Sequence, residues 1–160
     1  CIRAWSRRET VDIRSPEATR PWQHVLEPLS GYLTLGASLD KNISLHGEAY
    51  NFGPPGHQNH SVRDLIHEMA KHWDHVRWKD VSKKEEFFHE AGLLKLNCDK
   101  ALKDLNWMPT LQFEETINKT VQWYKAFYEN SEGSMVDFSL SQIEQYTQLA
   151  SSRRLSWASD

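Results

Sequence analysis

Apolar residues recur at helical spacing in three stretches of the chain. Leucines repeat over residues 26–39, and six apolar residues form one stripe over residues 62–73. Ser61 stands directly before that stripe and Asp64 follows three residues later, which is close to a capping box. Apolar side chains also recur every three or four positions over residues 113–129. These patterns predict three long helices.

Shorter patterns predict the elements beside these helices. Residues 1–10 have the character of a helix end, and residues 99–105 and about 138–149 indicate further helical segments. Short extended segments are predicted at residues 11–13, 22–25, 49–52, 76–81 and 93–96. A few short strands among four to five helices indicate an α/β fold, and we expect its sheet to be incomplete in this chain alone.

A Ser/Gly linker at residues 131–136 divides the chain into two parts. We expect one main unit at residues 1–130, and at residues 131–160 the linker, an amphipathic helix and a loose tail. The chain begins with Cys1 rather than Met, so we interpret it as an excerpt of a longer protein or as a processed product.

Composition narrows the class of protein. The net charge of −3 over 160 residues argues against a protein that coats nucleic acid. No apolar run approaches the roughly 18 residues of a membrane span, so we expect no membrane partner. The two cysteines exclude a disulfide scaffold and suit a reducing compartment, which indicates a cytoplasmic protein. Seven tryptophans predict either a large aromatic core or a ligand surface lined with rings.

The sequence lacks the common catalytic and cofactor motifs. It has no Gly-x-Ser-x-Gly, no glycine pattern of a dinucleotide site and no Tyr-x-x-x-Lys, so we expect no catalytic or cofactor-binding residue here. Eight histidines invite a metal-site interpretation, but His67 and His72 stand five residues apart, which turns their rings by ~140° from each other on a helix. We therefore expect surface histidines and no metal site.

Two positions could bind a phosphate. Arg20 precedes a proline and stands beside Trp22, where a stiff guanidinium fork can grip a pyrophosphate in bidentate fashion. Asn51 ends an apolar segment ahead of a Gly/Pro loop and the helix start at Ser61, where unsatisfied N–H groups point outward. From these residues alone, a solvated arginine and a plain strand-to-helix connection are the simpler interpretations.

Five motifs in a fixed order carry a family resemblance. The longest reads Arg-Ser-Pro-Glu-Ala-Thr-Arg-Pro-Trp-Gln-His-Val-Leu-Glu-Pro-Leu-Ser-Gly-Tyr and occupies residues 14–32. The others lie at residues 48–54, 89–97, 105–109 and 120–124, and residues 138–146 add a C-terminal segment. Together they resemble the CDP-glucose 4,6-dehydratases of the extended short-chain dehydrogenase/reductase superfamily. The resemblance covers roughly residues 1–149.

This resemblance implies a fold, an activity and partners. The intact enzymes are lyases of deoxysugar biosynthesis that bind NAD on an N-terminal Rossmann half. They oxidise the sugar at C4, eliminate water across C5 and C6, and return the hydride to C6. The chain would be the substrate-binding C-terminal portion, with residues 1–130 as the nucleotide-sugar-binding region. Its partners would be a CDP-sugar, the Rossmann half of the same protein and, when intact, a second subunit in a homodimer.

The resemblance also implies site residues. Arg20 matches the arginine that pairs with the substrate diphosphate, and Asn51 matches an asparagine near the phosphates or the ribose. His89, Glu90 and Lys95 lie in the segment that closes over the nucleotide end, and none of the five is catalytic.

Other residues in these motifs are expected to be structural. Trp22 and His24 would hold Arg20 in place, and Trp107 and Trp123 would lie in the core. Asn97 departs from the family pattern, which has an aspartate at this position. Two alternatives stay open: another NAD(P)-dependent nucleotide-sugar epimerase or dehydratase, and a non-catalytic module that binds a sugar or a protein.

Overall fold

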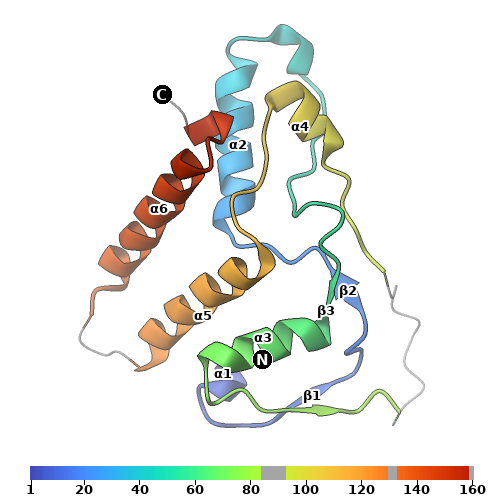
Figure 1. Cartoon of the computed structure of the whole chain (residues 1–160), viewed down its shortest axis with the longest axis vertical. Coiled ribbons are helices and arrows are strands. Elements are labelled where there is room, and N and C mark those ends of the chain that lie inside the picture. The colour runs from blue at the N-terminus through green and yellow to red at the C-terminus, as the bar shows by residue number, and fades with distance from the viewer. Residues whose placement is uncertain (84–92, 130–132, 159–160) are drawn as a thin grey trace.

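The computed structural model describes residues 1–83, 93–129 and 133–158 (Figure 1). Over these ranges it contains six α-helices, two short 3₁₀ turns and four short strands, so the chain is a mixed α/β structure dominated by helices. The elements in chain order are α1 (Ile2–Trp5), β1 (Val11–Ile13), β2 (Thr19–Arg20), α2 (Leu26–Leu39), η1 (Ile43–Leu45), β3 (His60–Ser61), α3 (Val62–His72), β4 (Trp78–Asp80), α4 (Asp99–Leu105), α5 (Phe113–Glu129), α6 (Met135–Ser152) and η2 (Ser156–Ala158).

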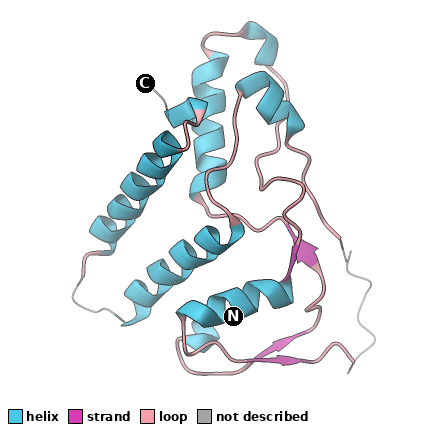
Figure 2. Cartoon of the chain, viewed as in Figure 1, coloured by secondary structure: helices cyan, strands magenta, loops and turns pink. Residues whose placement is uncertain are grey.

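The strands form two separate pairs (Figure 2). β1 and β4 run parallel, with Val11 opposite Trp78, while β2 and β3 run antiparallel, with Arg20 opposite His60. The predicted strand at residues 49–52 is wrong, because this segment is irregular and its buried ring packs against other rings instead of a sheet. The predicted strand at 93–96 is also wrong, since the segment is irregular there. Residues 22–25 likewise form no strand.

The larger core lies between α3 and α5. Trp5 of α1 is 1% exposed, and its indole N–H donates to the carbonyl oxygen of Arg77 at 2.7 Å. Around it are buried Ile13, Ile66, Met69, Trp73, Val76, Phe113, Ile117 and Val121. The apolar stripes that predict α3 and α5 therefore face each other, which explains why those two helices form where the pattern places them.

A second core holds α2 against α4. The ring of Phe52 meets that of Trp107 edge-on, with centroids 5.0 Å apart, and Leu45, Ala101 and Leu105 complete the cluster. A β-carbon at position 31 would lie 2.3 Å from Cδ1 of Phe52. Only glycine therefore allows α2 to pack this closely on the aromatic ring.

A buried carboxylate joins α2 to the segment before α5. Glu27 is 1% exposed, and its carboxylate accepts hydrogen bonds from the backbone N–H of Thr110 at 2.9 Å and of Leu111 at 2.6 Å. The hydroxyl of Tyr146 on α6 donates to the same carboxylate at 2.9 Å. Burial raises the pKa of Glu27, and these donors oppose that rise. The side chain thus connects three segments that are distant in the sequence.

Ser30 and Arg153 extend this network on either side. Ser30 accepts from the indole N–H of Trp107 at 3.0 Å and donates to the carbonyl oxygen of Glu27 at 2.8 Å. Arg153, just after α6, donates to Glu115 through both terminal nitrogens, at 2.9 and 2.7 Å, and also contacts the carbonyl oxygen of Thr110. In Figure 1 the chain from α4 to α5 runs down alongside α2 and crosses its lower part before it enters α5.

The C-terminal residues differ from the prediction. Instead of a loose tail, α6 continues to Ser152, and η2 places the ring of Trp157 over that of Tyr146 at a centroid distance of 5.5 Å. The prediction is wrong because it rests on the polar residues of this segment, whereas the aromatic ring of Trp157 packs on Tyr146. The earlier helices at residues 26–39, 99–105 and 113–129 are confirmed.

Replacing Glu27 by Ala should lower the free energy of unfolding by about 3–5 kcal/mol, because it leaves two buried backbone N–H groups without an acceptor and leaves the Tyr146 hydroxyl with only Ser30 to donate to. Gln should cost less, since its amide oxygen still accepts, and Tyr146→Phe should cost about 1 kcal/mol. Urea titration followed by circular dichroism measures each difference. A loss below 1 kcal/mol for Glu27→Ala would show that the carboxylate does not join these segments.

Candidate functional site

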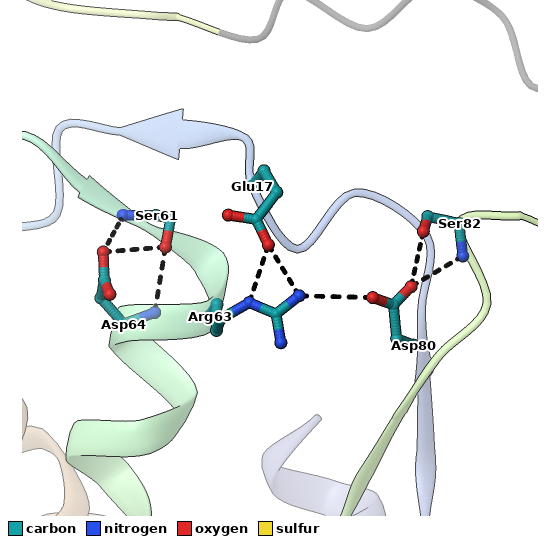
Figure 3. A network of polar contacts seen from close by, with 6 residues as sticks. All are labelled: Glu17, Ser61, Arg63, Asp64, Asp80 and Ser82. Atoms are coloured by element: carbon teal, nitrogen blue, oxygen red, sulfur yellow. Dashed lines mark hydrogen bonds and ion pairs between the residues drawn. The ribbon is translucent and has the colours of Figure 1, made fainter.

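The pairing of β2 with β3 positions Arg20. Its backbone pairs with His60, its side chain is half-buried, and one terminal nitrogen donates to the carbonyl oxygen of Thr19 at 2.7 Å. β3 continues directly into α3 through the predicted capping box. Ser61 Oγ accepts from the N–H of Asp64 at 3.1 Å, and the Asp64 carboxylate accepts from the N–H of Ser61 at 2.8 Å (Figure 3). The bonds that Ser61 donates to this carboxylate through its N–H and its hydroxyl lower the pKa of Asp64.

Arg63 fixes the turn that precedes β2. Figure 3 shows its guanidinium between Glu17, at 2.6 Å, and Asp80 at the end of β4, at 3.3 Å. Ser82 donates to Asp80 through its hydroxyl and its backbone N–H, and these two bonds are the main cause of the lowered pKa of Asp80. Because the ion pairs are exposed, they contribute little to the free energy of unfolding. Their main effect is to fix the positions of the segments that they join.

The residues after Arg20 anchor the same strand pair. The indole N–H of Trp22 donates to the carbonyl oxygen of His60 at 2.9 Å, directly opposite Arg20. The next side chain, Gln23, donates to the carbonyl oxygen of Phe52 at 3.1 Å, beside Asn51. Gln23 therefore links the Arg20 segment to the Asn51 segment, a contact that a single polar residue in a coil does not reveal from sequence.

Asn51 lies against the segment that carries Lys95. Its side-chain amide donates to the carbonyl oxygen of Asn97 at 3.2 Å, and a β-carbon on Gly53 would lie 2.9 Å from a methyl carbon of Leu96. Lys95 lines a cavity of about 520 Å³ together with the Gly/Pro loop at 53–56. The ammonium group of Lys95 is exposed and has no ion pair among the described residues.

The predicted site residues therefore fall into three groups. Asn51 and Lys95 come from adjacent segments, and Arg20 lies on β2, which Gln23 connects to the Asn51 segment. His89 and Glu90 lie outside the described residues. Within the described ranges, no three His, Cys, Asp or Glu side chains are grouped to hold a metal ion, and no helix is long and apolar enough to cross a membrane.

Two predicted structural residues behave differently from each other. Trp107 is 1% exposed and lies in the core as predicted. Trp123 is only half-buried and lines a cavity between α2, α5 and α6, so its assignment to the core is wrong. Its indole N–H donates to Ser139 on α6 at 2.9 Å, and one side of the ring faces the cavity.

Comparison with known proteins shows which enzymes the chain is similar to. No protein-family model matches it. It is 38% identical over 127 residues to a CDP-glucose 4,6-dehydratase of Salmonella typhimurium, a match that covers 79% of this chain and 35% of that protein. It is 31% identical over 86 residues to a dTDP-glucose 4,6-dehydratase of Escherichia coli, which covers 50% of this chain and 23% of that protein. The chain thus spans about a third or less of the length of these relatives.

These matches relate the chain to the nucleotide-sugar 4,6-dehydratases. Within that class, the resemblance to CDP-glucose 4,6-dehydratase that the motifs predict is confirmed, since this match is higher in identity and covers more of the chain.

His24 is a buried histidine close to the Arg20 segment. It is 7% exposed, and its Nδ1 accepts from the N–H of Leu26 at 3.3 Å. Burial, and secondarily the positive charge of Lys119, lower its pKa from 6.5 to about 4. The ring is therefore neutral at pH 7, with its proton on Nε2.

The lowered pKa of His24 predicts a loss of stability in acid. Because the unfolded chain binds a proton near pH 6.5 and the folded chain only near pH 4, stability falls as pH drops through this window, by up to about 3 kcal/mol from His24 alone. His24→Asn keeps an acceptor for the Leu26 N–H and should flatten the curve between pH 6.5 and 4. Urea titrations of both proteins at several pH values measure the difference; parallel curves would contradict it.

Proposed function

We propose that this chain is the substrate-binding C-terminal part of a CDP-glucose 4,6-dehydratase, which converts CDP-glucose to CDP-4-keto-6-deoxyglucose and water. The 38% identity over 127 residues to such an enzyme carries the proposal. In the intact protein, NAD would supply the oxidation and reduction. The chain has no glycine motif that would hold NAD, so its binding site and the catalytic residues would belong to an N-terminal Rossmann half.

The proposed role of this chain is to hold the nucleotide diphosphate. Arg20 offers a guanidinium on a braced strand pair, and Lys95 offers an exposed ammonium beside the Asn51 amide. Cations and amide donors of this kind are suited to phosphate oxygens. We assign Arg20 to the diphosphate, Asn51 to the phosphates or ribose, and Lys95, with His89 and Glu90, to the nucleotide end.

Uncovered apolar residues support a larger protein. On α2, Leu29 is 45% exposed and Leu33 is 76% exposed. Exposed apolar patches of this kind are typical of surfaces that another structural unit covers. We propose that the Rossmann half covers this face, that the intact protein is a homodimer, and that it acts in the cytoplasm.

A second candidate is another nucleotide-sugar enzyme of the same class. The matches to dTDP-glucose 4,6-dehydratases, at 31% identity over 86 residues, favour it. The choice between the two depends on the nucleotide base, for which the chain has no base-reading pattern. A non-catalytic binding module is the remaining alternative, and the sequence encoded upstream of Cys1 decides it: a glycine-rich turn and Tyr-x-x-x-Lys there would indicate an enzyme.

The chain by itself should not turn over CDP-glucose, because it lacks the tyrosine–lysine pair and the dinucleotide motif. Incubation of the 160 residues with CDP-glucose and NAD, followed by NMR, should show unchanged substrate. Formation of the 4-keto sugar by this chain alone would place the catalytic residues within it and would contradict the proposed division of labour.

Arg20→Ala should weaken the binding of CDP to the intact protein at least tenfold, because it removes a bidentate partner of the diphosphate. Arg20→Lys should give an intermediate affinity for CDP. Arg7→Ala, at an exposed position in the turn after α1, should leave the affinity unchanged. Isothermal titration calorimetry measures all four affinities. Equal affinity of the wild type and Arg20→Ala for CDP would refute the assignment, and tighter binding of UDP or dTDP than CDP would favour the second candidate.

A further inference from the structure

A cavity of about 550 Å³ lies where the start of α2 meets α5 and α6. It is within the size range of roughly 300–1,000 Å³ that small-molecule sites occupy. None of its lining side chains carries a charge at neutral pH, since His24 on its wall is neutral. Arg20 and Lys95 are not part of the wall, so this cavity is separate from the proposed diphosphate site.

Two buried side chains leave one polar atom each at this wall. His24 uses Nδ1 to accept from the N–H of Leu26, and its Nε2–H has no partner among the described residues. Gln142 is 5% exposed and donates through its amide nitrogen to the carbonyl oxygen of Lys119 at 2.9 Å. Its amide oxygen has no partner in the described part of the chain, and it is not sealed from solvent. These two atoms give the wall a donor and an acceptor beside the hydroxyl groups of Thr120, Tyr124 and Ser139.

Trp123 provides a fixed aromatic face beside these atoms. Its ring stacks on Phe127 with centroids 5.5 Å apart and planes 10° apart. Its indole N–H donates to Ser139, whose hydroxyl donates to the carbonyl oxygen of Met135. These contacts set the orientation of the indole from two sides, so a ligand would find it already in place.

The wall chemistry selects among classes of ligand. No cation lines the cavity to pair with an anion, and no carboxylate lines it to pair with a cation. The ammonium group of Lys119 acts on His24 from outside the lining and donates to the side-chain oxygen of Gln145. A purely apolar ligand would leave the His24 donor and the Gln142 acceptor unpaired at a cost. A hydroxyl both donates and accepts, so a ring with neighbouring hydroxyls can satisfy both atoms while its apolar C–H face covers the indole.

We propose that the cavity between α2, α5 and α6 binds an uncharged, hydroxylated ring of the monosaccharide class. His24 donates to one hydroxyl, Gln142 accepts from another, and Trp123 packs on the C–H face of the ring. The site lies outside the diphosphate site and does not depend on the proposed dehydratase function.

The probe is methyl α-D-glucopyranoside, added to the 160-residue chain and followed by saturation-transfer NMR and by the indole N–H resonance of Trp123. We expect a dissociation constant in the millimolar range, at about 4 kcal/mol of binding free energy. Gln142→Leu should weaken binding at least tenfold. Gln148→Leu is the matched control, because it makes the same change on the same helix at an exposed position outside the cavity, and its affinity should equal that of the wild type.

Further arms separate this site from the diphosphate site. Arg20→Ala should leave the affinity for the glucoside unchanged, and CDP should not displace it. Three results would each overturn the proposal. They are the absence of saturation transfer with the wild type, equal affinity of Gln142→Leu and the wild type for the glucoside, and displacement of the glucoside by cytidine. If Gln142→Leu does not fold, a shift of the Trp123 indole resonance by the glucoside, without shifts at the six other indoles, still decides the location.

Discussion

The buried carboxylate of Glu27 is the interaction on which the arrangement of the helices depends. It takes hydrogen bonds from the segment before α5 and from Tyr146 on α6, so one side chain of α2 sets where two other elements begin or lie. A carboxylate can be buried only when its oxygens accept hydrogen bonds. Most of the hydrogen bonds to Glu27 come from backbone N–H groups. The cavity beside Trp123 exists because α2, α5 and α6 are held in this relation.

This role changes how the longest family motif is understood. Residues 14–32 contain Arg20, proposed to contact the diphosphate, but they also contain Glu27, Ser30 and Gly31, whose contacts are internal. A motif that separates one family from its relatives can therefore owe much of its character to packing. The sequence similarity to the 4,6-dehydratases is therefore stronger evidence for a shared fold than for a shared substrate, because substrate choice depends on fewer side chains.

The sequence predicts the helices well and the strands poorly, for physical reasons. Helical periodicity accumulates over 14 residues in α2 and 17 in α5, and burial against one neighbouring surface reinforces it. The segment at 49–52 is apolar because Phe52 packs on Trp107, a contact that produces the same short pattern as a strand. Arg20 and Asn51 stand out as isolated polar residues, but the Gln23 bond that connects their segments is non-local and leaves no periodic signal.

The stretch from Arg20 to Glu27 passes through three electrostatic environments within eight residues. Arg20 is half-buried and charged, the His24 ring is neutral because burial lowers its pKa, and Glu27 is enclosed by donors. The backbone between them bonds to Phe52 through Gln23 and to β3 through Trp22. A displacement of the Glu27 anchor would therefore move the strand that carries Arg20. The position of the guanidinium depends on the same network that closes the helical part of the fold.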